Sequence, residues 1–332
     1  MNTHWFSSHA VGSTPEFVFE SVEEDFEQQA AGYRELGVNY TQLSRGRFRG
    51  RMISALLGKI SIYVEHCNQT MEKEITLPPD RFHICLALDE TEPARRSNCG
   101  SLKDCVHMVP PDGKSLAVFP ANSVLLVITV DRQSLLQSSG LVPQVADWLA
   151  CLSVGGAVID SARLAQRLRT DIISALEGAA NATPHDKRAA LNQATVLAVS
   201  SALTMEWLPL NTLKLCRSTH AYERFRTARS LLLNDAGEFG GQVGRPLKRL
   251  GSKRSIEQAF TDYVAMGPIT YARVVRLHKA RRKLLDRERL NESIGNIAAE
   301  EGFWDGSRFA SYYRRHFGEL PSETRDRSPT AR

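Results

Sequence analysis

The stretch from Asn291 to Arg325 constrains the fold of this chain more strongly than any other segment. It reads NESIGNIAAEEGFWDGSRFASYYRRHFGELPSETR, and aromatic residues recur in it at Phe309, Tyr313 and Phe317. Residues spaced by four lie on one face of a helix, so these three predict the buried side of a helix. Gly302 precedes that helix and predicts a sharp turn from a shorter apolar helix. The segment therefore indicates two short helices joined by a glycine turn.

The side of the second helix that points away from the aromatic residues is small and polar. The residues expected near the outward face are Gly306, Ser307, Arg308, Ala310, Ser311 and Tyr312, with Arg314 and Arg315 on its flank. A helix of this size fits the major groove of DNA, where arginine makes a paired contact to guanine and serine pairs more permissively. This face is therefore a candidate for contacting base pairs, with other Lys and Arg side chains holding phosphates.

The segment resembles the C-terminal helix-turn-helix of the AraC/XylS family of bacterial transcription regulators. The matching residues are Ile297, Ala298, Gly302, Phe303, Ser307, Phe309, Tyr313, Phe317, Gly318, Leu320, Pro321, Ser322 and Arg325. Upstream, the stretch from Pro268 to Leu285 is similar to the long linker helix of that family. The resemblance implies an all-α DNA-binding domain over residues 219–326, with two helix-turn-helix motifs joined by the linker helix.

The first of the two implied motifs is the less regular one. Residues 252–268 resemble the family's first recognition helix, and the possible DNA contacts there are Ser252, Lys253, Arg254, Ser255 and Gln258. Before them the chain reads GGQVGRPLKRLGS, and glycine costs about 1 kcal/mol and proline about 3 kcal/mol inside a helix. We expect the supporting helix to begin near Pro246 or to be distorted, and the sequence leaves open whether this motif contacts DNA.

The resemblance also implies which residues of the two motifs are buried and how far apart the two reading helices lie. The residues expected to form the structural core are Ile256, Phe260, Ile297, Ala298, Gly302, Phe309, Tyr313, Phe317 and Pro321. A rigid linker helix would place the two reading helices in successive major grooves, about 34 Å apart. Most basic side chains between His278 and Arg289 are expected to be solvated, with some approaching phosphate. Arg276 either contacts DNA or pairs with an acidic neighbour.

The first half of the chain is rich in short β-branched and aromatic segments. Strands are predicted within residues 40–58 and over residues 59–66, 81–88, 114–120 and 123–130, separated by Gly, Pro and Asn. They indicate a small antiparallel barrel or sandwich. From Asp131 onward, apolar residues recur at three- and four-residue spacing, which is typical of amphipathic helices.

These two halves indicate an α+β chain of two domains, since 332 residues exceed one ordinary core. We expect a first domain over residues 1–210 and a boundary near Leu208 to Ser218, where Pro209 and Asn211 interrupt the helical pattern. The strand-then-helix order resembles the cupin-like sensor domain of the same family, which binds an effector or mediates dimerisation. One apolar ridge, Leu164, Leu168, Ile172 and Leu176, fits the core of this domain or a second subunit.

Charge is distributed unevenly along the chain. After position 220 there are 22 Lys and Arg residues against 14 Asp and Glu, whereas the first 220 residues carry 20 against 23. Neutralising phosphates requires clustered cations, so a basic C-terminal third favours binding to nucleic acid. A solvated basic surface is the alternative that charge alone leaves open.

Catalytic motifs are not apparent. A cupin metalloenzyme needs three or four convergent ligands, and the nearest cluster, Cys99, Cys105 and His107, resembles no standard metal site. No nucleophile elbow, phosphate loop or dinucleotide fingerprint occurs. We expect no metal, no cofactor and no enzymatic activity, and a cupin-like metalloenzyme with an accessory basic domain is the minor alternative.

We therefore expect a cytoplasmic, sequence-specific DNA-binding transcription regulator, acting as an activator under the control of an effector bound to its N-terminal domain. The expected partners are double-stranded promoter DNA, RNA polymerase, an unknown small molecule and a second copy of the chain in a homodimer. No apolar run reaches the roughly 20 residues that cross a membrane. Control by a protein partner instead of a small ligand stays open, and neither the effector nor the operator can be read from the sequence.

Overall fold

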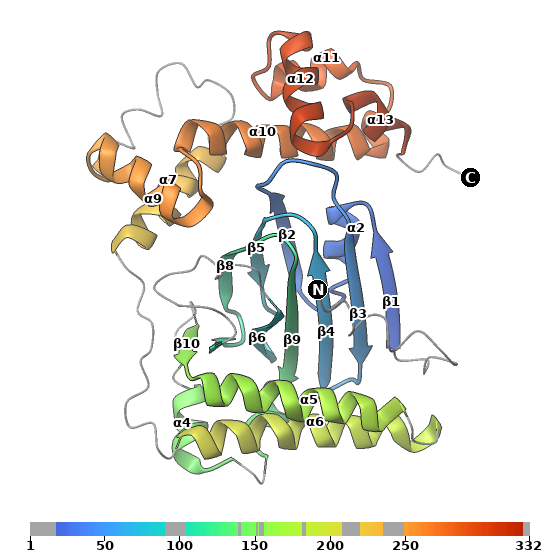
Figure 1. The fold of residues 1–332 in the computed structure, drawn as a ribbon, viewed down its shortest axis with the longest axis vertical. Coiled ribbons are helices and arrows are strands. Elements are labelled where there is room, and N and C mark those ends of the chain that lie inside the picture. The colour runs from blue at the N-terminus through green and yellow to red at the C-terminus, as the bar shows by residue number, and fades with distance from the viewer. Residues whose placement is uncertain are drawn as a thin grey trace.

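A computed structural model describes residues 18–89, 104–138, 141–150, 152, 156–180, 184–207, 220–234 and 249–327. Strands fill the first part of the chain and helices fill the last part (Figure 1). The fold is thus mixed, with sheets toward the N-terminus and helices toward the C-terminus. The expected boundary at residues 208–218 lies outside the described residues.

Two antiparallel sheets form the N-terminal half. The larger sheet has the order β1 (Val18–Glu23), β3 (Gly50–Leu56), β4 (Ile60–Cys67), β9 (Ser123–Asp131), β6 (Arg81–Asp89), β7 (Cys105–Val109) and β10 (Ala157–Asp160). The smaller sheet has the order β2 (Gly37–Gln42), β5 (Met71–Thr76) and β8 (Lys114–Phe119). Tyr63 and Val127 of the larger sheet and Tyr40 and Ile75 of the smaller one belong to one buried cluster. The sheets therefore pack face to face.

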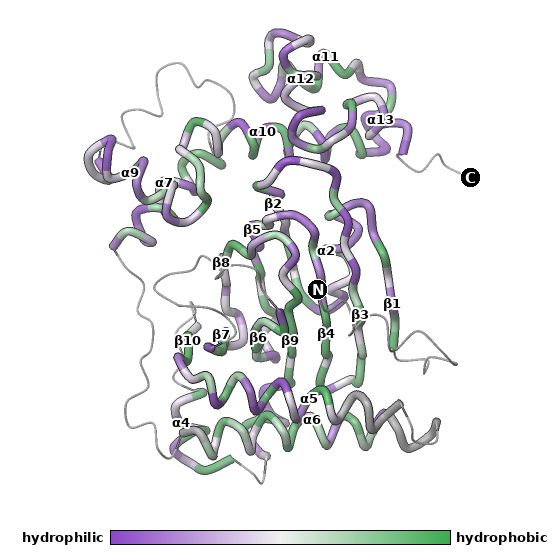
Figure 2. The backbone as a smooth tube through the Cα atoms, in the orientation of Figure 1, coloured by the Kyte–Doolittle hydropathy of each residue, from purple (hydrophilic) through white to green (hydrophobic). Residues whose placement is uncertain are grey.

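Strands with a strong apolar pattern lie where the sequence predicts them. Observed β4, β6, β8 and β9 differ from the predicted ranges by no more than one residue at either end. Alternate residues of the larger sheet, such as Ile62 and Ile128, face away from the smaller sheet into a second core cluster. Figure 2 shows β4 and β9 as largely hydrophobic, as strands buried on both faces should be.

Helices cover the outer face of the larger sheet. They are α3 (Arg132–Leu136), α4 (Pro143–Ala150), α5 (Ala162–Ala180) and α6 (Pro184–Trp207), with α5 and α6 side by side in Figure 1. Leu164, Leu168 and Ile172 are almost fully buried against the sheet, which confirms that this ridge belongs to the core. The side chain of Leu176 lies outside the described residues.

The C-terminal helices are arranged along one long helix, α10 (Pro268–Leu285). At its start pack α7 (His220–Asn234) and α9 (Lys253–Val264), and at its end pack α11 (Ile294–Glu300), α12 (Gly306–Phe317) and α13 (Pro321–Asp326) (Figure 1). A short 3-10 turn, Arg287–Arg289, follows α10. Eighteen residues of α-helix measure about 27 Å, so α10 separates the two groups of helices by about that length.

The N-terminal and C-terminal halves share their cores. Phe26 of α2 (Phe26–Ala31) and Phe48 cluster with Leu277 of α10 and Phe317 of α12. A separate cluster joins Leu116 and Val118 of β8 with aromatic residues of α7, α9 and α10. The helices are thus docked on the sheets and not tethered at a distance. No helix among the described residues is long and apolar enough to cross a membrane.

Candidate nucleic-acid interface

The helix pair α11 and α12 has well-defined ends. The Ser293 side chain caps α11 by accepting a hydrogen bond from the Asn296 amide at 3.0 Å, and Asp305 caps α12 by accepting from the Arg308 amide at 3.0 Å. Gly302 between the helices has a φ of 75°, which glycine adopts without strain. The predicted glycine turn is therefore confirmed at the predicted residue.

The inner side of α12 is aromatic and buried. Phe309, Tyr313 and Phe317 are each no more than 3% exposed, and Ile297 and Ala298 of α11 belong to the same cluster. These contacts use the i, i+4, i+8 face that the sequence predicts. They leave the opposite side of α12 without a packing role.

The outer side of α12 is free of the rest of the protein. Gly306, Ser307, Arg308, Ser311 and Arg315 are all exposed. The Arg308 side chain is 78% exposed, and its guanidinium lies 3.4 Å from the carboxylate of Asp305, a weak surface pair. Docking of the two halves therefore does not cover this face, and Arg308 can turn toward a ligand.

Tyr312 differs from the other candidates on α12. It is half-buried, and the guanidinium of Arg273 on α10 lies 4.6 Å from the centre of its ring. The tyrosine is thus at the edge of the outer face, beside α10.

Helix α9 presents a similar division of sides. Ile256 and Phe260 are buried against α7 and α10, as predicted. The exposed candidates at its start are Ser252, Lys253, Arg254 and Gln258, while Ser255 is half-buried. The Ser252 side chain also caps the helix by accepting from the Ser255 amide at 3.1 Å. Ser252 therefore has a structural role that the sequence pattern did not separate from a role in binding.

The segment expected to support α9 is only partly visible. Pro246 and the preceding glycines lie outside the described residues, so the predicted start or distortion of that helix is not tested. Gly251 has a φ of 144°, which disfavours any residue with a side chain. The turn into α9 therefore depends on glycine at this position.

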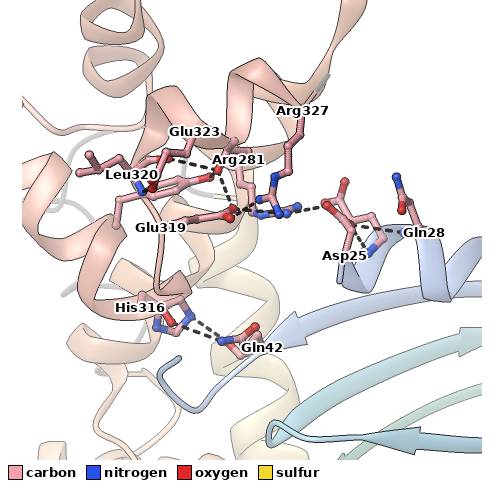
Figure 3. A network of polar contacts seen from close by, with 12 residues as sticks. Asp25, Gln28, Gln42, Arg281, His316, Glu319, Leu320, Glu323 and Arg327 are labelled. Atoms are coloured by element: carbon pink, nitrogen blue, oxygen red, sulfur yellow. Dashed lines mark hydrogen bonds and ion pairs between the residues drawn. The ribbon is translucent and has the colours of Figure 1, made fainter. Parts of the chain in front are cut away.

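A buried charge network fixes the α12 and α13 end of the C-terminal half on the N-terminal half (Figure 3). Arg281 of α10 donates to the carboxylate of Asp25 at 2.5 Å and lies 3.7 Å from Glu319. Glu319 in turn pairs with Arg327. Burial alone would raise the pKa of Asp25, but the charge and hydrogen bond of Arg281 outweigh it and lower that pKa. Asp25 thus stays ionised and holds α10 against α2.

A second buried network fixes the α7 and α9 end. Arg229 of α7 donates to Glu72 of β5 at 2.7 Å and 3.0 Å and reaches Glu74 at 3.1 Å. The hydroxyl of Tyr271 on α10 donates to Glu72 at 2.9 Å. Burial raises the pKa of Tyr271, and the Glu72 charge raises it further, so the hydroxyl keeps its proton. Both ends of α10 are therefore attached to the small sheet or to α2 by charged groups.

Two histidines meet one backbone carbonyl between these networks. His278 of α10 and His316 of α12 each donate from Nε2 to the Gln42 oxygen, at 3.1 Å and 3.0 Å. Burial lowers the pKa of His316 to about 4, and burial together with the neighbouring His316 lowers the pKa of His278 well below its usual value. Both rings are therefore neutral in the docked protein at neutral pH.

This arrangement predicts that acid destabilises the docked state. An exposed imidazole in the unfolded chain binds a proton below about pH 6.5, whereas His316 in the fold binds one only near pH 4. The unfolded state therefore gains protons first, and His316 should lower the free energy of unfolding by about 2 kcal/mol from pH 7.5 to pH 5, with His278 acting in the same direction. Urea unfolding at the two pH values measures this. His316→Gln keeps a donor and should reduce the fall, and an equal fall in this variant would contradict the assignment.

The basic run from His278 to Arg289 does not behave as the sequence suggests. Five of its six Lys and Arg side chains are engaged by protein groups: Lys279 with the Leu233 carbonyl, Arg281 with Asp25, Arg282 with Glu27, Lys283 with Glu300 and Glu301, and Arg289 with Glu292 and Glu300. The expectation that most are simply solvated is therefore wrong. Arg276 lies 5.6 Å from the centre of the Phe303 ring and has further partners in the structure.

Sequence reasoning missed the docking residues. Asp25, Glu72 and Arg229 carry no local signal, because each is a single charge whose partner lies far along the chain. The one available hint was the unusual density of charge on β5, MEKEIT, in a chain region otherwise read as apolar strands.

A buried polar network lies within the core between the two sheets. Lys73 donates to Glu65 at 2.5 Å, and Tyr33 and Tyr40 also donate to that carboxylate. The cavity left beside them is only about 10 Å³, room for no more than one water. Within the described part of the chain, no three His, Cys, Asp or Glu side chains are grouped to hold a metal. Cys105 and His107 are buried on β7, and Cys99 lies outside the described residues.

A groove of about 360 Å³ opens where the two halves meet. Its floor is apolar and aromatic, including Leu36, Val38 and Tyr40, and Glu27 of α2 and Arg282 of α10 lie at its rim. These two charged side chains pair at 3.1 Å. The groove is thus bounded by both halves of the protein.

Comparison with known proteins identifies the C-terminal helices. A family described as "Helix-turn-helix domain" matches residues 251–327. A probable thc operon regulatory protein of Rhodococcus erythropolis is 35% identical over 72 residues, 22% of this chain and 22% of that protein. A XylDLEGF operon transcriptional activator of Pseudomonas putida is 40% identical over 73 residues, 22% of this chain and 23% of the activator. The chain thus matches less than a quarter of the length of these relatives.

Among solved structures, the AraC-like transcriptional activator CuxR aligns with 79% of this chain and 94% of its own, at 17% identity and a TM-score of 0.38. The sequence matches place residues 251–327 in a helix-turn-helix domain of the DNA-binding kind. The match lies over the same residues as the pattern around Gly302 and Phe309.

Proposed function

We propose that this protein is a sequence-specific DNA-binding transcription regulator. The observation that carries the proposal is the exposed outer side of α12, where Ser307, Arg308 and Ser311 face solvent in a matched helix-turn-helix domain. Arginine and serine on a helix of this length can reach base edges in the major groove. The relatives named above are regulators of operons, which supports the same role here.

The DNA-binding unit extends over residues 219–326 and uses two motifs. In this proposal α9 reads a second element through Lys253, Arg254 and Gln258, whose side chains are exposed. The linker α10 is about 27 Å long, comparable with the roughly 34 Å between successive major grooves on one side of the duplex. The two helices would then read two elements about one helical turn apart.

Residues 1–210 serve as a cupin-like sensor domain in this proposal. The cavity beside Glu65 and Lys73 between the sheets has room for about one water, whereas the groove beside Arg282 has a volume of about 360 Å³. An effector in that groove would contact α2, β2 and α10 together and would bias their docking. A metabolite screen by thermal shift on the full chain tests this: a specific ligand raises the melting temperature. A screen without one would favour control by a protein partner.

The proposal also covers the location of the protein in the cell, its partners and the direction of control. We place the protein in the cytoplasm with promoter DNA, as an activator that contacts RNA polymerase and forms a homodimer, without enzymatic activity. The relatives that are named activators support this direction of control.

Selection from a pool of random DNA duplexes tests the proposal directly. Full-length protein should enrich one sequence with two conserved elements about 10 base pairs apart. Its affinity should fall steeply as salt rises, because cations on the protein release counterions from phosphates. Failure to enrich any sequence, with equal affinity for all duplexes, would contradict sequence-specific reading.

A further inference from the structure

Arg273 on the linker helix α10 has no carboxylate partner among the described residues. Five of the six Lys and Arg residues from 279 to 289 are engaged by carboxylates or, for Lys279, by a backbone carbonyl, and the sixth, Arg287, lies beyond the end of α10. Arg273 lies one and a half turns earlier, and it forms no ion pair with any carboxylate in the described parts of the chain. The orientation of the Arg273 side chain is therefore not fixed by an ion pair.

Tyr312 orients the Arg273 side chain. The central carbon of the Arg273 guanidinium lies over the Tyr312 ring, 4.6 Å from its centre, which is a cation–π contact. This contact engages the ring face and leaves the N–H groups of the guanidinium available for hydrogen bonds to a phosphate. Tyr312 follows Arg308 by four residues, so it lies on the same face of α12 as the base-reading candidate.

The surroundings of Arg273 are open on the side away from the sheets. Ile269 and Thr270, about one turn earlier on α10, are exposed. The buried side of the helix, which includes Leu277, Ala280 and Leu284, packs within the protein. Arg273 is thus half-exposed between α9 and α12, on the helix that would cross the duplex between two major grooves.

We propose that Arg273, held by Tyr312, binds a phosphate of the DNA backbone between the two elements read by α9 and α12. The inference rests on the proposed function and extends it to a positioning residue. A phosphate contact carries no sequence information but fixes the register of the protein on the duplex. Because Arg273 also contacts Tyr312, a phosphate bound by Arg273 would fix where the outer face of α12 lies along the duplex.

The test compares the affinity of full-length variants for the selected duplex and for a scrambled duplex across a range of salt concentrations. Arg273→Ala should weaken both complexes by about tenfold, because a hydrogen-bonded charge is lost. It should also reduce the slope of log affinity against log salt by about one. Arg287→Ala removes a more exposed cation just beyond the end of α10 and should change neither quantity. Tyr312→Ala should lower the salt slope as Arg273→Ala does, because the slope reports the number of cations at phosphates and not a contact of the tyrosine itself.

The outcomes separate the inference from the function on which it rests. If the wild type reads its site and Arg273→Ala matches it in affinity and salt slope, the phosphate contact is wrong and the regulator stands. If Arg273→Ala changes base preference without changing the slope, the residue reads bases and the inference is also wrong. If the wild type binds no duplex, both fail. Arg273→Lys, which keeps the charge, should retain most of the slope and guards against a loss caused by misfolding.

Discussion

Glu72→Gln is expected to lower the free energy of unfolding by about 3 to 5 kcal/mol, the cost of leaving a buried charge without its partner. Glu72 is 1% exposed and accepts from Arg229 at 2.7 Å and from Tyr271 at 2.9 Å. Glutamine has almost the same volume, so no cavity accompanies the change. The loss comes from the Arg229 guanidinium, which stays buried with a neutral group in place of the carboxylate.

The matched control for this prediction is the neighbouring carboxylate on the same strand. Glu74 also pairs with Arg229, at 3.1 Å, but its side chain is 41% exposed. Glu74→Gln should therefore cost less than about 1 kcal/mol, as exposed pairs do. Urea unfolding of both variants measures the difference. Equal and small effects would mean that the Glu72 network does not hold α7 and α10 on the sheet.

Docking of this kind connects the N-terminal half directly to both helices that we propose read DNA. The Arg229 network anchors the end that carries α9, and the Arg281 network anchors the end that carries α12. Both outer faces remain exposed in the docked state, so docking acts on the orientation of the helices and not by covering them. A signal that changes either network would therefore change the spacing at which the two helices meet DNA.

The parts of this structure that follow from local pattern could be predicted from the sequence. The aromatic triad on α12 needs only its own helix to define a buried side, and Gly302 needs only its own backbone to define a turn. The strongly apolar strands, such as β4 and β9, are likewise legible because both of their faces are buried.

The parts that depend on distant partners could not be predicted. Strand β5 reads MEKEIT, and its Glu72 and Lys73 are buried because they meet Arg229 and Glu65, 157 and 8 residues away. Likewise, the cations after His278 look like a solvated or phosphate-binding run until Asp25, Glu27 and Glu300 are seen beside them. A pattern of apolar residues does not predict that a charged side chain is buried when its partner comes from another part of the chain.

The second large effect concerns Arg308, which we expect to read a base. Its side chain is exposed and only weakly held by Asp305, so a guanine edge can replace that partner at small cost. A paired arginine contact to guanine discriminates by about 1 to 3 kcal/mol. Arg308→Ala should therefore weaken binding to the selected site by about 10- to 100-fold, and should relax base preference at one or two positions only.

Base preference at every position of the selected site, measured for the wild type, Arg308→Ala and the charge-matched Arg287→Ala, tests the central claim most directly. In Arg308→Ala we expect base preference to be lost within one element of the site and kept in the other. In Arg287→Ala we expect base preference to match the wild type at all positions. A profile for Arg308→Ala that matches the wild type at all positions would show that α12 does not read bases, and would contradict the account.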